Sequence, residues 1–544
     1  MGSLPCRLAA IFVTCVAVCI TGVSAEEPLH VQIDRKIAGG LADYERGVAP
    51  QSSDAEFLRR ISIDLGGRIP STGESRAFLA DPSLDKRSKL IEQLLAGPEF
   101  ARRMQEHFDV LLMDRRGDAK VPRADWEEFL RSSFAANKPY DELVREILST
   151  SGADPKTRPA AKFLLERDLE PTLVTRDISR LFQGRNLQCA QCHDHPLVTD
   201  YQQEHFYGIQ AFVNRAFLFP NAQDAKAVIA EKAEGEVSFI SVFDPKKLQK
   251  TTVPTVPGGK PIADAKIEKG KEYTVAPAKD IKPVPAYSRM AKLAAAITAE
   301  ENVAFRRTAV NRLWAMMLGR GLIHPLDYDH SSNPPSHPEL MTLLADEFVR
   351  RKYDVKWFLR EIALSKAYQR SSEAPKGVKD VPEDRFAVAP LKPLSPEQLG
   401  YSTLQATGLT DLYRHELAKA LTEPALHSKL TPHMGPFLQL YGTRPGIPEE
   451  GFAATLDQTL FVKNGDPIRN LIAARTGGLV ERAAKLPDPN AIVEELFLAV
   501  YSRMPSDDER RDFGELLRPA VNRAKVLPDI VWAMLASAEF RFNH

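Results

Sequence analysis

The two cysteines beyond residue 19 stand three positions apart, and a histidine follows directly after them. Cys189 and Cys192 enclose Ala190-Gln191 and precede His193. Two thiols at this spacing can add to the two vinyl groups of one haem, and the next residue then lies under the iron as its proximal ligand. The segment therefore predicts one covalently bound haem c, attached through Cys189 and Cys192 and ligated by His193.

The same side chains permit other states. Cys189 and Cys192 could form a local disulfide in an oxidising compartment. Together with His193 and His195 they could instead bind zinc or copper, because two thiolates and two imidazoles suit both ions. A thioredoxin-like redox pair fits less well, since no βαβ pattern surrounds the motif.

The spacing of residues along the sequence does not identify the second axial ligand of such an iron. His195 is only two residues from His193, so its side chain is too close in sequence to bind the opposite face of the same iron. We expect it instead to orient a haem propionate or to cap the loop. A vacant or water-bound sixth position would favour catalysis or sensing over simple electron transfer. Residues of the remaining candidate types more commonly serve core packing or an exposed polar contact. These candidates are His205, His337, Met290, Met316 and Met317.

The N-terminal residues have the layout of a secretory signal peptide. Arg7 precedes an apolar run over residues 8–23, and the small residues Ser24 and Ala25 precede Glu26. The run has 16 residues, fewer than the roughly 20 that a membrane-spanning helix needs, so a retained anchor is the second interpretation. We expect cleavage after Ala25, a periplasmic or otherwise exported protein, and no integral membrane span after cleavage.

Cysteine usage agrees with export. Three of the five cysteines lie within the predicted signal peptide, namely Cys6, Cys15 and Cys19. The mature chain therefore keeps only Cys189 and Cys192. A large exported protein without further cysteines does not use disulfides as scaffolding, so this pair serves a local purpose.

Composition excludes some classes of partner. The 544 residues are 43% hydrophobic and 26% charged, which are ordinary values for a globular protein. Lys and Arg together number 72, as do Asp and Glu, so the chain has no net field that would attract a polyanion. We therefore expect no nucleic-acid partner.

Most of the chain has the period of amphipathic helices, with apolar residues at i, i+3 and i+4. Asp81-Pro82-Ser83 and Asn137-Lys138-Pro139 mark boundaries between helices. The fold class is therefore mainly α. The clearest helical segments are residues 77–95, 126–148, 304–318, 340–348 and 492–501.

Residues 235–285 lose this period. Residues 236–243 and 272–275 are β-branched and aromatic runs, and prolines and glycines fall between and after them. We therefore predict a signal peptide (residues 1–25), a helical domain with the Cys motif (26–234), a small β excursion and Pro-rich linker (235–285) and a second helical domain (286–544).

Two pairs of segments recur in mirrored order. Residues 68–78, copy A, and residues 503–513, copy A′, both begin with Arg-x-Pro-Ser and continue with Glu, Arg and Phe at equal intervals. Residues 129–147, copy B, and residues 348–362, copy B′, also match, although amphipathic helices produce such matches by chance. An internal duplication would place two related helical units around the Cys motif and shelter a haem between them.

These motifs resemble a family abundant in planctomycetes. It combines a cytochrome-like N-terminal domain, the domain of unknown function 1549, with a C-terminal domain of unknown function 1553. The N-terminal resemblance rests on Ile33-Asp34-Arg35, Phe57-Leu58-Arg59-Arg60, Asp64-Leu65, Gly67-Arg68-Ile69-Pro70 and residues 187–196. The C-terminal resemblance rests on residues 310–314, 319–321, 333–340 and 367–372 and on the closing residues 537–544.

The resemblance implies an exported protein with a c-haem-type motif, in a family whose activity is not established. Members are often encoded beside sulfatase-like proteins, which implies a sulfatase-like exported protein as a partner. Some carry an additional cytochrome domain, and the single Cys-x-x-Cys-His in this sequence predicts that it has no such additional domain. Glu204-His205-Phe206 stands where relatives commonly have acidic and aromatic residues, so the resemblance does not support His205 as a ligand.

The function expected from these features is electron transfer or haem-dependent redox chemistry with an unknown redox partner. The alternative is a non-redox binding or structural protein whose Cys/His cluster holds a non-haem metal or a disulfide. Because members of the family are often encoded beside sulfatase-like proteins, we also consider that this protein supports the breakdown of sulfated polysaccharide at the cell envelope. Whether the protein is an enzyme is left open, because the sequence has no Ser-His-Asp spacing, phosphate loop or nucleophile elbow.

Overall fold

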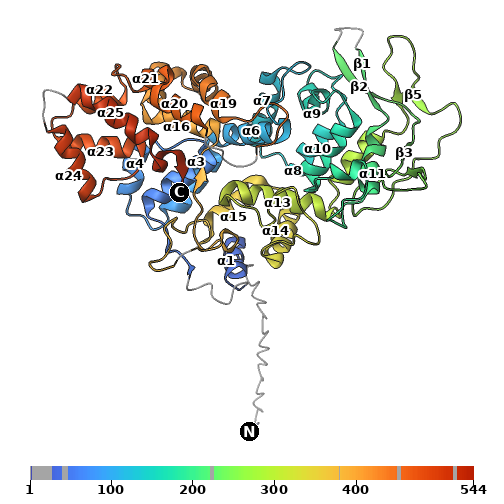
Figure 1. The fold of residues 1–544 in the computed structure, drawn as a ribbon, viewed down its shortest axis with the longest axis horizontal. Helices are drawn as coiled ribbons and strands as arrows, with labels where there is room; N and C mark the ends of the chain where they lie inside the picture. The colour runs from blue at the N-terminus through green and yellow to red at the C-terminus, as the bar shows by residue number, and fades with distance from the viewer. Residues whose placement is uncertain are drawn as a thin grey trace.

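The computed structural model describes residues 27–39, 47–220, 226–378, 380–449, 455–518 and 523–544, together with residue 2. The predicted signal peptide, apart from Gly2, lies outside these residues. Helices dominate the described chain, and its sheets are small and two-stranded (Figure 1). The predicted mainly α fold with a small β excursion is confirmed. None of the described helices is both long enough and apolar enough to span a bilayer.

The helices of the first half carry most of the larger apolar core. They are α1 (Leu29–Gly39), α3 (Asp54–Gly66), α4 (Thr72–Ala80), α5 (Lys86–Ala96), α6 (Pro98–Met113), α7 (Arg123–Ala135), α8 (Tyr140–Ser149), α9 (Lys162–Leu165), α10 (Pro171–Gln183) and α11 (Gln203–Val213), with the 3₁₀-helices η1 (Arg158–Ala161) and η2 (Cys189–Gln191).

The helices of the second half begin after the β excursion. They are α12 (Arg289–Ile297), α13 (Val303–Leu318), α14 (Pro338–Arg350), α15 (Val355–Leu364), α16 (Pro396–Ala406), α17 (Leu409–Leu417), α18 (Glu423–Leu430), α19 (Gly435–Tyr441), α20 (Leu456–Asn464), α21 (Asp466–Ile472), α22 (Leu479–Ala484), α23 (Pro489–Val500), α24 (Asp507–Leu517), α25 (Arg523–Ala536) and α26 (Ala538–Arg541). The short 3₁₀-helices η3 (Glu383–Arg385), η4 (Ala418–Ala420) and η5 (Thr431–His433) lie between them.

Two apolar cores organise these helices. The larger core contains buried side chains from α1 to α15, so it draws on helices from both sides of residues 235–285. The smaller core is formed by α16 to α26 and also includes Ile63 and Ile69 from the end of α3 and the loop that follows it. In Figure 1 the helices of the smaller core gather at one end of the molecule, and α6 lies between them and α10.

The strands form antiparallel pairs that lie mostly at the opposite end (Figure 1). Strands β3 and β5 fall within the two predicted runs, although the first run is strand only over three residues. Strands β1 and β2 precede residue 235 and were not predicted. The pairs are β1 (Ala216–Pro220) with β2 (Ala227–Glu231), β3 (Val237–Phe239) with β4 (Lys250–Thr252), β5 (Tyr273–Val275) with β6 (Val284–Pro285), and β7 (Lys392–Pro393) with β8 (Phe542–Asn543).

Copies A and A′ have the same local structure. Arg68 donates two hydrogen bonds to the Glu74 carboxylate, at 3.0 and 3.1 Å, and Arg503 does the same to Glu509, at 2.7 Å each. In each copy the serine caps the helix, α4 or α24, and the glutamate completes a capping box. The matched residues therefore repeat one arrangement of arginine, capping serine and glutamate.

Loss of the capping hydroxyl is expected to lower the free energy of unfolding by the same amount in copy A and in copy A′. Ser71→Ala and Ser506→Ala should each lower the free energy of unfolding by about 1 kcal/mol, because a backbone N–H in the first turn loses its acceptor. Urea unfolding of the mature chain measures this. Ser132→Ala, on the exposed face of α7, is the control and should be neutral or slightly stabilising. Unequal losses at residues 71 and 506 would contradict the equivalence.

Copies B and B′ pack directly against each other. Each forms two helices joined by a turn with a positive φ, at Asn137 in copy B and at Lys352 in copy B′. The Tyr140 N–H donates to the Tyr353 carbonyl at 3.1 Å, and the Asn137 amide donates to Asp354 Oδ1 at 2.8 Å. The repeated units thus meet through their own turns, and both cysteines are exposed instead of sheltered between them.

Two buried arginines of α3 donate hydrogen bonds to backbone carbonyls far along the chain, including those at its C-terminal end. The Arg59 guanidinium donates to the carbonyls of Val500, Glu539 and Phe540, at 3.1, 3.2 and 2.8 Å. Arg60 donates to the carbonyls of Tyr368, Arg370 and His544, at 2.7, 2.7 and 3.1 Å. Both arginines belong to the Phe57-Leu58-Arg59-Arg60 motif, whose role here is structural.

Candidate functional site

The Cys motif lies on a tight surface turn between α10 and α11. Cys189 opens the 3₁₀-helix η2, and its carbonyl accepts hydrogen bonds from the backbone N–H groups of Cys192 and His193, at 3.2 and 3.4 Å. Ala190 is buried beneath the turn. Both thiols are exposed and neither is in a disulfide. The turn therefore presents two free thiols at the surface.

The imidazole of His193 is oriented by the backbone. Its Nδ1 lies 2.7 Å from the carbonyl oxygen of Asp194. Because a carbonyl can only accept, Nδ1 carries the proton, and the lone pair of the neutral ring is on Nε2. Histidines that bind metals commonly have this arrangement, with the other ring nitrogen donating to a carbonyl. His193 is thus prepared to bind a metal through Nε2.

An apolar surface lies beside the Cys turn. The Val242 N–H donates to the Cys192 carbonyl at 3.0 Å, and the Phe243 ring lies 4.6 Å from that of His193. Phe243 is 73% exposed and Val242 is 65% exposed. Apolar side chains exposed together mark binding surfaces, because water is a poor partner for them. A flat apolar group could cover them.

His195 caps the loop that follows the turn. Its Nδ1 accepts the backbone N–H groups of Leu197 and Val198, at 3.2 and 3.0 Å. Partial burial, with the nearby His330 and His193, lowers the pKa of His195, so the ring is neutral at pH 7. Loop capping is one of the two roles that the sequence suggested for this residue, and it occupies only Nδ1.

A loop from the second half of the chain supports the Cys turn. The backbone N–H of Ser331 donates to Asp200 at 2.7 Å, and the Tyr201 hydroxyl donates to the Asp329 carbonyl at 3.3 Å. The His330 ring lies 5.5 Å from that of Tyr201, and its buried Nδ1 has no hydrogen-bond partner. No sequence pattern identifies His330, because only the fold brings its ring beside Tyr201.

The other predicted ligands lie in different surroundings. His205 is in the first turn of α11, where its Nδ1 accepts the N–H of Gln202 at 3.4 Å. His337 is buried before α14; its Nδ1 lies 3.1 Å from the Ser336 hydroxyl and its ring 5.7 Å from that of Phe386. Met316 and Met317 are buried on α13, and their carbonyls accept hydrogen bonds from Lys392. None of these contacts involves the Cys turn.

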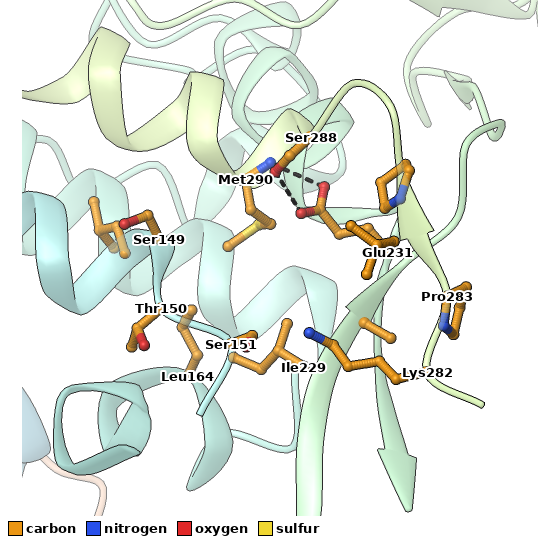
Figure 2. A pocket seen from close by; sticks show the side chains of 14 residues that line it. Ser149, Thr150, Ser151, Leu164, Ile229, Glu231, Lys282, Pro283, Ser288 and Met290 are labelled. Atoms are coloured by element: carbon orange, nitrogen blue, oxygen red, sulfur yellow. Dashed lines mark hydrogen bonds between the residues drawn. The ribbon is translucent and has the colours of Figure 1, made fainter. Parts of the chain in front are cut away.

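Met290 lines a separate pocket of about 170 Å³ (Figure 2). The Glu231 carboxylate there accepts the Ser288 hydroxyl at 2.5 Å and the N–H of Met290 at 3.1 Å, which joins β2 to the start of α12. Burial lowers the pKa of Lys282, which also lines the pocket. These hydrogen bonds of Glu231 hold β2 against the start of α12.

Within the described part of the chain, no group of three or more His, Cys, Asp and Glu side chains is arranged to hold a metal ion. The predicted zinc or copper set of Cys189, Cys192, His193 and His195 is therefore not assembled as such a group. A covalent haem requires other groups at the turn, namely two reachable thiols, one imidazole and an apolar surface. The residues present fit that group.

Two family models match the chain. The model PSCyt2, a protein of unknown function (DUF1549), matches residues 32–217, and the model PSD1, a protein of unknown function (DUF1553), matches residues 289–432. The two matched regions have the order that the sequence motifs predicted, with DUF1549 in the N-terminal part and DUF1553 in the C-terminal part. The Cys turn lies in the PSCyt2 region, whereas the supporting loop around His330 lies in the PSD1 region. No curated protein and no solved structure matches the chain.

Proposed function

We propose that this PSCyt2–PSD1 protein is an exported c-type haem protein that acts in electron transfer or haem-dependent redox chemistry. In this proposal Cys189 and Cys192 hold one haem through thioether bonds, and His193 Nε2 binds its iron. The observation that carries it is the combination of two exposed free thiols with a histidine whose Nδ1–H is held by a carbonyl. The name of the PSCyt2 family agrees with a cytochrome.

A bound haem would supply a one-electron redox centre, and this chain's own residues would tune it. The Asp194 carbonyl fixes the tautomer and orientation of His193 and increases the basicity of Nε2. Val242 and Phe243 offer apolar contact beside the turn, and where they cover a bound haem they would keep water from it, which favours the less charged state of a redox centre. The supporting loop around His330 holds Asp200 and Tyr201, which follow the Cys turn in the chain.

Export is part of the proposal, because c-type haem is attached outside the cytoplasm. The signal peptide predicted over residues 1–25 would deliver the chain to the periplasm or cell envelope. There we expect an exported redox partner, and the family resemblance adds a sulfatase-like protein as a candidate.

Expression in a host that matures c-type cytochromes tests the proposal. The full chain should be exported and contain one haem per chain that stays bound after denaturation, measured as its pyridine haemochrome spectrum. The matched control lacks residues 2–25 and should stay in the cytoplasm without covalent haem. A colourless exported protein with stoichiometric zinc would overturn the haem assignment in favour of a non-haem metal site.

A further inference from the structure

The pocket of Figure 2 lies between the last turn of α8, helix α9, strands β2 and β6 and the start of α12. Its volume of about 170 Å³ is close to the roughly 150 Å³ of a cavity that holds one benzene molecule. Of the side chains that line it, only Glu231 and Lys282 are acidic or basic. Much of the wall is apolar and buried, with Leu148, Leu164, Ile229 and Met290.

Lys282 places an amine at the wall of this pocket without a partner in the described part of the chain. Figure 2 shows its side chain lying along the pocket, with the nitrogen turned toward the interior. Within the described residues, this nitrogen has neither a hydrogen bond nor an ion pair. By contrast, the buried amine of Lys392 bonds to Asp64 at 2.7 Å. Lys282 is therefore available to a molecule that enters the pocket.

The surroundings of this amine favour its neutral form. Burial lowers the pKa of Lys282, and the charged group that opposes this shift is the Glu231 carboxylate. That carboxylate makes no ion pair with Lys282 and is held instead by the Ser288 hydroxyl at 2.5 Å and the Met290 N–H at 3.1 Å. A neutral amine has a free lone pair, so it is a nucleophile, whereas an ammonium is not.

We propose that Lys282 binds small aldehydes or ketones in this pocket covalently, as an imine. The amine nitrogen attacks the carbonyl carbon and a C–N bond forms. The carbonyl oxygen then leaves as water with the two protons of the amine, so no oxidant or reductant is needed. The apolar wall suits the carbon body of such a compound. An anion would instead face the Glu231 carboxylate, which opposes its binding.

Reductive trapping of the mature chain with benzaldehyde tests this proposal, and it needs neither haem nor the proposed function. Cyanoborohydride converts an imine into a stable secondary amine, and peptide mass spectrometry measures the labelled fraction of each lysine. The exposed Lys279, three residues earlier, is the matched control. At pH 7 Lys282 should be labelled about tenfold faster, because a lysine with an ordinary pKa of about 10.4 is almost fully protonated there. Equal or slower labelling of Lys282 would overturn the proposal.

Two further measurements on the unmodified chain separate binding in the pocket from reactivity alone. Raising the pH to about 10.5 should bring the two labelling rates closer, because Lys279 then becomes largely neutral as well. Formaldehyde has no carbon body to contact the apolar wall, so its ratio of Lys282 to Lys279 labelling should be smaller than that of benzaldehyde. Equal ratios for the two aldehydes would mean that the pocket does not bind the compound, and the proposal would fail.

A matched pair of variants tests the role of the neighbouring charge. Glu231→Gln should increase the labelling of Lys282 at pH 7 by about threefold, because it removes the charge that stabilises the ammonium. Its amide oxygen can still accept the hydrogen bonds that Glu231 accepts. Glu234→Gln, at an exposed position outside this pocket, should leave the labelling unchanged. Equal effects of the two variants would contradict a Lys282 amine that faces Glu231 in the pocket.

Discussion

Cys189→Ser combined with Cys192→Ser is expected to abolish covalent haem attachment, and each single substitution is expected to leave one thioether bond. The two thiols lie at the two ends of one tight turn, both exposed and both free. Each can therefore reach one vinyl group independently of the other. After denaturation, haem should be fully extractable by acid–acetone from the double variant and retained by each single variant.

The single variants also separate haem from the alternatives. One remaining vinyl group should move the pyridine haemochrome band of each single variant to a longer wavelength than that of the unmodified chain. A zinc site would lose its ion equally in the single and double variants, because each thiolate is a ligand. Stability of the haem-free chain should change little in all three, since the thiols are exposed and not in a disulfide. Equal loss of haem from one single variant and the double variant would contradict attachment through both thiols.

The motif residues differ in burial, and this difference separates structural from functional roles. Arg59, Arg60 and Asp64 are buried and bonded to groups more than 300 residues away. The side-chain amide of Asn311, in the second half, donates to the Ile323 carbonyl and accepts the Ile323 N–H. The two cysteines are exposed on a loop instead. Buried motif residues serve the fold, whereas a motif exposed on a loop is where function is expected.

The sequence predicted the helices better than it predicted their partners. Periodicity located α13, α14 and α23 closely, because apolar spacing within one helix is local information. The predicted segment 77–95 is two helices, and α5 begins at Lys86 instead of at the Asp81-Pro82-Ser83 boundary. Strands β1 and β2 were missed because a short hairpin has little periodic signal.

In the candidate site too, the sequence identified only residues that are close to one another along the chain. Spacing alone identified the two thiols and His193, which are adjacent in sequence. It could not identify Val242, Phe243 or His330, because they reach the Cys turn only through the fold. The copies A and A′ were recognisable because their arginine, serine and glutamate bond within six residues. The direct packing of copy B against copy B′ could not be recognised from the sequence, because it joins residues that are far apart along the chain.

Asp64→Asn is expected to lower the free energy of unfolding by about 3 kcal/mol at pH 7, because it removes the carboxylate from a buried pair. Asp64 is 2% exposed and accepts hydrogen bonds from the Tyr368 hydroxyl, the Lys392 ammonium and the Asn543 amide, at 2.8, 2.7 and 2.9 Å. This carboxylate therefore joins α3 to the β7–β8 pair at the C-terminus. The midpoint of urea unfolding measures the loss.

A double-mutant cycle isolates the ion pair. Lys392→Met in the Asp64→Asn background should cost less than the sum of the single substitutions, by about 1–3 kcal/mol, because no unpaired ammonium then remains. The exposed pair Asp85 and Lys89, at 2.9 Å on the surface of α5, is the control. Asp85→Asn should produce no measurable loss, since surface ion pairs contribute little. An additive cycle at residues 64 and 392 would contradict the coupling.

The pH dependence of Asp64→Asn has a definite sign. Burial lowers the pKa of Lys392, and Asp64 is the main group that opposes this shift, so the variant should lower that pKa further. Between the folded pKa and the unfolded value of about 10.4, the unfolded chain binds a proton that the folded chain has lost. Stability of the variant should therefore rise with pH across this window, more steeply than that of the unmodified chain. A flat profile would mean that Lys392 stays charged through its bonds to the carbonyls of Met316 and Met317 alone.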